Sequence, residues 1–85
     1  MISKQMQAMW MKERDEAVIS YDVDRFRKFY EKWRKIGMYS VPLPKNDLVV
    51  KITMRKMVYH ITAFSKEQRE EAAKWLKDRG MSTDL

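Results

Sequence analysis

Cysteine is absent from this chain of 85 residues, and histidine, glycine and proline are scarce. Without cysteine there is neither a disulfide framework nor a thiolate metal site. His60 is the only histidine, and no cluster of His, Asp and Glu supplies the roughly three or four ligands of a metal site. Two Gly and two Pro accompany 45% apolar and 35% charged residues, a composition typical of a folded helical protein. We therefore expect no metal and no cofactor.

Long apolar runs are also missing. No stretch approaches the roughly 18 apolar residues that a membrane span requires. The opening MISKQMQAMWMKERDE lacks the apolar core of a signal peptide. Because the absence of cysteine also fits a reducing compartment, we predict a cytoplasmic protein with no membrane partner.

Signatures of catalysis are missing as well. His60 has no serine or carboxylate at a workable spacing, so a surface or boundary position is its simplest role. There is neither a glycine-rich phosphate loop nor a nucleophile motif. We therefore predict that the protein is not an enzyme, with no catalytic residues and no small-molecule substrate.

Helix ends are marked by glycine. The stretches KWRKIGM and KWLKDRGM each place a glycine, Gly37 or Gly80, after a charged amphipathic run and before a methionine. A glycine can adopt the left-handed conformation that closes the last turn of a helix. Helix starts are marked by Asp22, before apolar residues at spacings of three and four, and by Ser65 with Gln68 at capping-box spacing. Helices are therefore predicted over 23–36 and 66–79.

The segment DLVVKITMRKMVYHIT, residues 47–62, is rich in the β-branched residues that favour strands. However, no Gly or Pro interrupts residues 45–64, so no hairpin turn is available, and a strand of this length would lack a partner. We therefore predict a helix over 47–61. A further helix is predicted over 4–19, although Glu13 interrupts its apolar stripe.

Together these patterns predict an all-α fold: a compact bundle of four helices with an ordered proline-containing loop at 38–46. Residues 1–85 should form a single helical domain, with residues 1–4 and 82–85 as the places to expect fraying. The predicted core is formed by Phe26, Phe29, Tyr30, Trp33, Leu48, Ile52, Met54, Met57, Val58, Ile61, Ala72, Trp75 and Leu76.

Three stretches carry a resemblance to a known family: ERDEAVISYDVDRFRKFYEKW, RKMVYH after a proline loop, and EAAKWLKDRGMS. Over about residues 12–83 the chain resembles a family of short uncharacterised proteins associated with phages and mobile elements of gut bacteria. The shared positions are mostly helix caps and core. The resemblance implies a phage-like origin, and it implies no activity and no site residue.

Methionine and tryptophan are abundant, with eight Met and three Trp. Flexible thioethers suit adaptable binding surfaces, and several methionines crowd the first predicted helix. One interpretation is that the first helix and the proline loop dock onto another protein or a second copy. The alternative is that the same side chains only cap the core. The candidate docking residues are Met6, Met9, Trp10, Tyr39 and Leu43.

The net charge of +6 arises entirely from residues 22–62, which hold ten basic and four acidic residues. Such a patch could neutralise several phosphates of a nucleic acid. The alternative is a solvated helix face, because the basic residues of the second helix spread over its whole polar arc. Nucleic-acid binding is therefore the second hypothesis, after protein binding. Its candidate phosphate-contacting residues are Arg25, Lys28, Lys32, Arg55 and Lys56.

Overall fold

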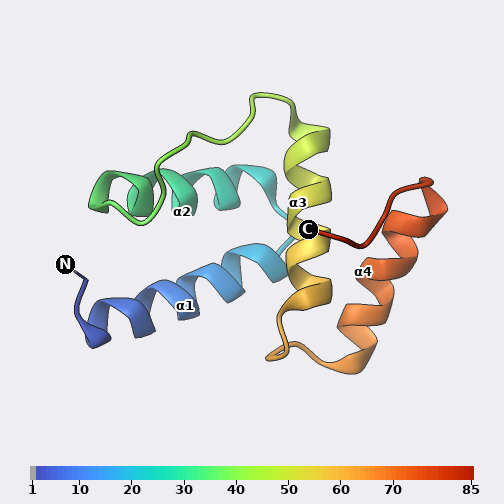
Figure 1. Ribbon diagram of the computed structural model, residues 1–85, viewed down its shortest axis with the longest axis horizontal. Coiled ribbons are helices and arrows are strands. Elements are labelled where there is room, and N and C mark those ends of the chain that lie inside the picture. Colours follow the sequence, from blue (N-terminus) through green and yellow to red (C-terminus); the bar gives the residue numbers. More distant parts are fainter. Residues whose placement is uncertain (1) are drawn as a thin grey trace. The chain divides into compact units, whose positions relative to one another are not determined.

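The computed structural model describes residues 2–85 and contains four helices in this range (Figure 1). They are α1 (Lys4–Ile19), α2 (Val23–Ile36), α3 (Asp47–His60) and α4 (Lys66–Asp78). No residue between 2 and 85 lies in a strand. The all-α prediction is confirmed, and every predicted helix boundary lies within one residue of the observed boundary.

The starts of the helices are held by side chains that accept hydrogen bonds from first-turn N–H groups. Asp22 accepts from the N–H of Arg25 at 3.1 Å, and Asn46 accepts from that of Leu48 at 2.8 Å. At α4 the predicted capping box is complete, since Ser65 and Gln68 each bind the other's backbone N–H. These caps satisfy donors that a helix leaves unpaired.

The start of α1 is capped as well. The hydroxyl of Ser3 accepts a hydrogen bond from the N–H of Met6 at 3.2 Å. The fraying expected at residues 1–4 falls partly on Met1, which lies outside the described residues. A serine cap without acidic residues in the first turn is what holds this end of α1.

Both glycines end helices as predicted. Gly37 and Gly80 have φ values of +107° and +70°. After each glycine, the N–H of the next residue reaches back to the helix: Met38 N–H donates to Trp33 and Met81 N–H to Leu76, both at 2.9 Å. The N–H groups of the glycines also donate, Gly37 to the carbonyl of Arg34 and Gly80 to that of Lys77. The two bonds at each helix end form the Schellman motif, which satisfies the last carbonyls of a helix.

The chain divides into an N-terminal unit, described here over residues 2–45, and a C-terminal unit of residues 46–85. In the N-terminal unit α1 packs on α2. The buried residues of this unit are Ala17, Val18, Phe26, Phe29 and Trp33. The rings of Phe26 and Phe29 are tilted against each other, and their centroids lie 5.8 Å apart. The expected single domain of residues 1–85 stays a prediction.

In the C-terminal unit α3 packs on α4. Its buried residues are Val50, Met54, Val58, Ala72, Ala73 and Leu76. The three residues of α3 follow one another at a spacing of four, so they form one stripe on the helix. The segment rich in β-branched residues is therefore an amphipathic helix rather than a strand.

One predicted core residue is wrong, because Leu48 is 49% exposed. Leu48 precedes Val50 by two positions, which is about 200° around a helix, so it points away from the buried stripe. The remaining predicted core residues are buried or half-buried. The half-buried ones are Tyr30, Ile52, Met57, Ile61 and Trp75.

Candidate functional site

Two of the predicted docking residues are brought together in the N-terminal unit. The indole Nε1–H of Trp10, on α1, donates a hydrogen bond to the hydroxyl of Tyr39 at 3.0 Å. The ring of Tyr39 stacks on that of Tyr30, with centroids 4.1 Å apart. The guanidinium of Arg14 lies 4.8 Å from the centroid of the Trp10 ring. Trp10 and Tyr39 therefore serve contacts within the unit.

The proline-containing loop is fixed against α2 by side-chain hydrogen bonds to its carbonyls. The hydroxyl of Tyr30 donates to the carbonyl of Val41 at 2.6 Å. The guanidinium of Arg27 donates to the carbonyls of Pro44 and Lys45 at 2.8 and 3.0 Å. The prediction of an ordered loop is confirmed.

The Tyr39 hydroxyl is only partly accessible to solvent. Burial raises the pKa of Tyr39 above its ordinary value, and the neighbouring Tyr30 raises it further. The hydrogen bond from Trp10 and the charge of Arg14 act in the opposite direction and lower this pKa. Since burial is the largest cause, the hydroxyl stays protonated well into the alkaline range.

The other three predicted docking residues differ in exposure. Met6 and Leu43 are half-buried, whereas Met9 is 54% exposed. Met9 is therefore the most exposed of the five predicted docking residues. Met11 and Val41, which are not among the predicted docking residues, are also exposed, at 48% and 65%.

The predicted phosphate-contacting residues divide between the two units, and three of them form ion pairs. Lys32 Nζ lies 2.6 Å from Glu13 Oε1. Arg25 pairs with Glu16, and Arg55 pairs with Glu71, both at 3.8 Å. Arg55 also lies 5.1 Å from the centroid of the Trp75 ring, and only 15% of its side chain is exposed.

The other two predicted phosphate-contacting residues, Lys28 and Lys56, have no ion pair within residues 2–85. Lys28 is exposed and Lys56 is half-buried. Of the five candidates, these two have charges that a phosphate could neutralise without separating an existing ion pair.

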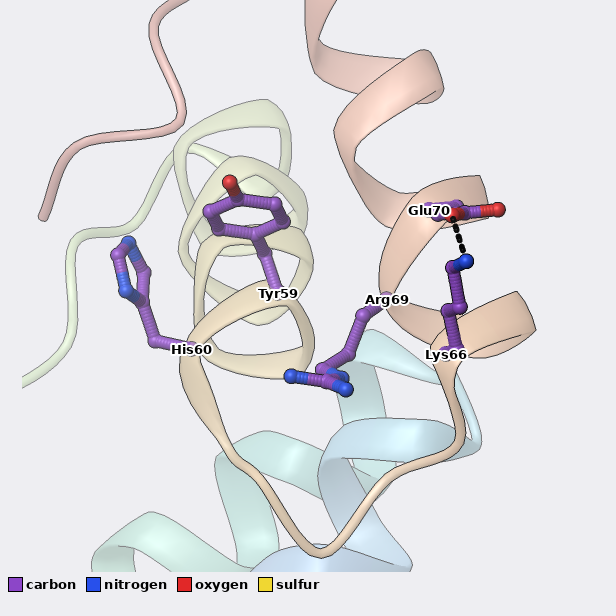
Figure 2. Close-up of a pocket in the computed structure, with 5 residues that line it drawn as sticks. All are labelled: Tyr59, His60, Lys66, Arg69 and Glu70. Carbon is purple, nitrogen blue, oxygen red and sulfur yellow. Dashed lines mark ion pairs between the residues drawn. The ribbon is translucent and has the colours of Figure 1, made fainter.

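A depression of ≈ 410 Å³ on the C-terminal unit was not anticipated from the sequence (Figure 2). It is lined by Tyr59, His60, Lys66, Arg69 and Glu70. The last three belong to the run KEQREE, which has the pattern of a solvated helix face. No local sequence signal indicates that this run lies beside an aromatic residue of α3.

The polar side chains around this depression differ in the partners that they have. Lys66 Nζ lies 3.8 Å from a carboxylate oxygen of Glu70, and both side chains are largely exposed. His60 Nε2 lies 2.7 Å from the carbonyl of Thr83, so this nitrogen carries the proton and donates the bond. The Nε of Arg69 is buried and has no hydrogen-bond partner.

No group of three or more His, Asp and Glu side chains that could hold a metal ion is found within residues 2–85. Across the same residues, no helix has the length and the apolar character that crossing a bilayer would require.

Comparison of the chain with protein families, with curated proteins and with solved structures yields no match. The resemblance to phage-associated proteins therefore stays a prediction, and the function is inferred from the side chains themselves.

Proposed function

We propose that the protein is a non-catalytic module that binds another protein through one flank of α1. The observation that supports this most is the exposure of Met9, an apolar residue that is 54% exposed to solvent. Met6 lies three positions earlier and therefore on the neighbouring part of the same helix surface. Trp10, the residue after Met9, is held by Tyr39 and supports the helix from its packed side.

Unbranched thioether side chains suit this role because they adapt to the shape of a partner. The association would bury apolar area and would depend little on salt. The partner chemistry that fits is an apolar groove on another protein or on a second copy of this chain.

Met11 provides a matched control on the same helix. It is 48% exposed, close to the value for Met9, but two positions away and so about 200° around the helix. A photo-crosslinking residue at position 9 should form protein adducts in a host lysate, and the same residue at position 11 should form few. The adducts should persist at about 0.5 M salt, where exposed ion pairs are screened.

Sedimentation of the purified protein over a range of concentrations distinguishes a second copy from a different partner. Equal labelling from positions 9 and 11, or no adduct from either, would contradict binding through this flank of α1.

Nucleic-acid binding is the second candidate, and the unpaired Lys28 and Lys56 are the observation that favours it. Five phosphate contacts would weaken binding roughly 500-fold between about 50 and 200 mM salt, whereas two would weaken it roughly tenfold. Because Arg25, Lys32 and Arg55 form ion pairs, we expect the smaller salt dependence if binding occurs.

A shift assay with random duplex and single-stranded DNA and RNA at these two salt concentrations tests this second candidate. In the variant Lys28→Glu/Lys56→Glu the charges of both unpaired lysines are reversed. Micromolar binding by the natural sequence that is lost in the variant would favour nucleic acid over the α1 surface.

A further inference from the structure

Tyr30 on α2 and Tyr39 in the proline-containing loop form a closely stacked pair of phenol rings. Their centroids lie 4.1 Å apart and their planes differ by 13°. Aromatic pairs in proteins more often have centroids about 4.5–7 Å apart. Because these two rings are close and nearly parallel, ring carbons of one phenol lie beside ring carbons of the other. The contact does not involve Met9, so a role for the tyrosine pair is independent of the proposed protein binding.

Hydrogen bonds and a further ring contact hold the two phenols in this stack. The Tyr30 hydroxyl donates to the carbonyl of Val41 at 2.6 Å, and the Tyr39 hydroxyl accepts from the indole N–H of Trp10 at 3.0 Å. The ring of Phe29 lies edge-on to that of Tyr39, with centroids 6.4 Å apart. Both tyrosines are half-buried, so their phenols can still exchange an electron with a reagent in solvent. The stack is therefore preorganised and open to oxidation.

The aromatic neighbours of the pair compete poorly for an oxidant. A phenyl ring such as that of Phe29 has no O–H or N–H, so its oxidation cannot be assisted by the loss of such a proton. Trp10 is the competing group, because an indole is about as easily oxidised as a phenol. However, the guanidinium of Arg14 lies 4.8 Å from the centroid of the Trp10 ring. Its positive charge opposes the positively charged radical that an indole forms when it loses an electron.

We infer that Tyr30 and Tyr39 are a site of oxidative modification, at which a one-electron oxidant such as a peroxyl radical joins the two rings. Each phenol gives one electron to the oxidant and one proton to water, which leaves two phenoxyl radicals with unpaired spin on the carbons ortho to oxygen. One carbon–carbon bond then forms between an ortho carbon of each ring. Each of these carbons releases its hydrogen as a proton and each oxygen regains one, so two oxidant equivalents are consumed and two hydrogen atoms are lost overall.

The product is a covalent link between α2 and the loop that follows it. The loop is already attached to α2 by the hydrogen bonds that Tyr30 and Arg27 donate to its carbonyls. A covalent link between the same elements restricts the unfolded chain, as a disulfide does. Oxidation at this pair therefore reinforces a contact that the folded protein already makes.

The test oxidises the full-length protein with tris(bipyridine)ruthenium(III), a one-electron oxidant generated by light and persulfate. At about 10 μM protein, coupling within a chain is favoured over coupling between chains, because groups within one chain have a millimolar effective concentration. The fluorescence of dityrosine should appear in the monomeric fraction. Trypsin should release the peptides 29–32 and 36–45 joined to each other, with a mass two hydrogen atoms below the sum of the separate peptides.

Three variants and one change of conditions identify the site. Tyr30→Phe and Tyr39→Phe should each abolish the dityrosine fluorescence of the monomer, and circular dichroism checks that both variants fold. Tyr59→Phe is the matched control and should leave this fluorescence unchanged. Tyr59 is the single tyrosine of the C-terminal unit and, at 37% exposed, is more accessible than either member of the pair. Unfolding the natural protein in urea should lower the yield about threefold or more, because only a flexible segment then keeps the phenols together.

Any of three results would overturn the inference. The first is a monomeric fraction without dityrosine, in which oxidation has occurred only at other residues or between chains. The second is dityrosine that persists in the monomer when either Tyr30 or Tyr39 is replaced. The third is an equal yield from the folded and the urea-unfolded protein, which would show that proximity in sequence, and not the stack, directs the coupling.

Discussion

Replacing Gly37 by alanine should destabilise the protein more than replacing Gly80, although both glycines end helices in the same motif. A Cβ added at either position would meet no atom within 4 Å, so steric contact with neighbours does not separate them. Their backbones do differ. Gly80 has φ +70°, at the edge of the left-handed region of about +50° to +70° that other residues visit, whereas Gly37 has φ +107°, well outside it.

The expected magnitudes follow from this difference. A left-handed residue with a Cβ costs about 1–2 kcal/mol, and a conformation outside that region costs up to about 3 kcal/mol. Alanine also restricts the unfolded chain, which offsets about 0.5 kcal/mol of either cost. We therefore expect a loss of about 1 kcal/mol for Gly80→Ala and about 2 kcal/mol for Gly37→Ala.

Urea unfolding followed by circular dichroism measures both losses, and thermal unfolding should show decreases in Tm of about 5 and 10 °C. Gly80→Asn should cost less than Gly80→Ala, because asparagine tolerates the left-handed conformation better. Lys35→Ala, at an exposed position on the last turn of α2, serves as the control and should change stability by less than about 0.5 kcal/mol. A larger loss for Gly80→Ala than for Gly37→Ala would refute the explanation from φ.

Further predictions concern the contacts inside each unit. Tyr39→Phe should destabilise the protein by about 1 kcal/mol, because it leaves the Trp10 indole N–H without its acceptor, and the loss should shrink when Trp10 is also replaced by Phe. Because the pKa of Tyr39 is raised in the folded state, the stability that its protonated hydroxyl contributes is complete below the ordinary tyrosine pKa and is lost as pH rises through the folded-state pKa. Unfolding measured at increasing alkaline pH should therefore show a smaller decline in the free energy of unfolding for Tyr39→Phe than for the natural protein. Val50→Ala should lower the free energy of unfolding by about 2 kcal/mol, whereas Leu48→Ala should lower it by less than about 0.5 kcal/mol. Equal losses in chemical unfolding would contradict the observed orientation of α3.

Helix positions were predictable from the sequence because their signals are local. The acceptor side chain of Asp22 and the reciprocal pair Ser65 and Gln68 act on N–H groups only a few residues away. The glycines act on carbonyls of the turn that they end. For α3 the decisive observation was also local, since no turn residue allowed the β-branched segment to form a hairpin. None of these inferences requires knowledge of which helices touch.

The buried faces were less predictable because they depend on the partner helix. On α3 the sequence offers two apolar stripes, and its pattern alone does not decide which one is covered. The structure buries the stripe that contains Val50 and leaves Leu48 and Tyr59 exposed. Four buried residues were left out of the predicted core: Ala17, Val18, Val50 and Ala73.

The candidate sites were the least predictable, because each depends on contacts between residues distant in sequence. Trp10 and Tyr39 are 29 positions apart, and their hydrogen bond accounts for two residues that seemed available for docking. Arg69 is the opposite case: it lies in a charged run typical of a solvated face, yet its Nε is buried. Neither fact follows from composition or periodicity.

The contact between Glu13 and Lys32 shows how one such pairing settles two separate ambiguities. Glu13 interrupts the apolar stripe of α1, which made this helix the least regular of the four in the sequence. Its carboxylate lies 2.6 Å from the ammonium of Lys32 on α2, so the interruption is a point of attachment between the two helices. The same contact engages Lys32, one of the residues expected to contact phosphate. Since both side chains are partly exposed, the pair contributes little to stability, but it joins the polar edges of α1 and α2 and so supports the orientation in which Met9 faces solvent.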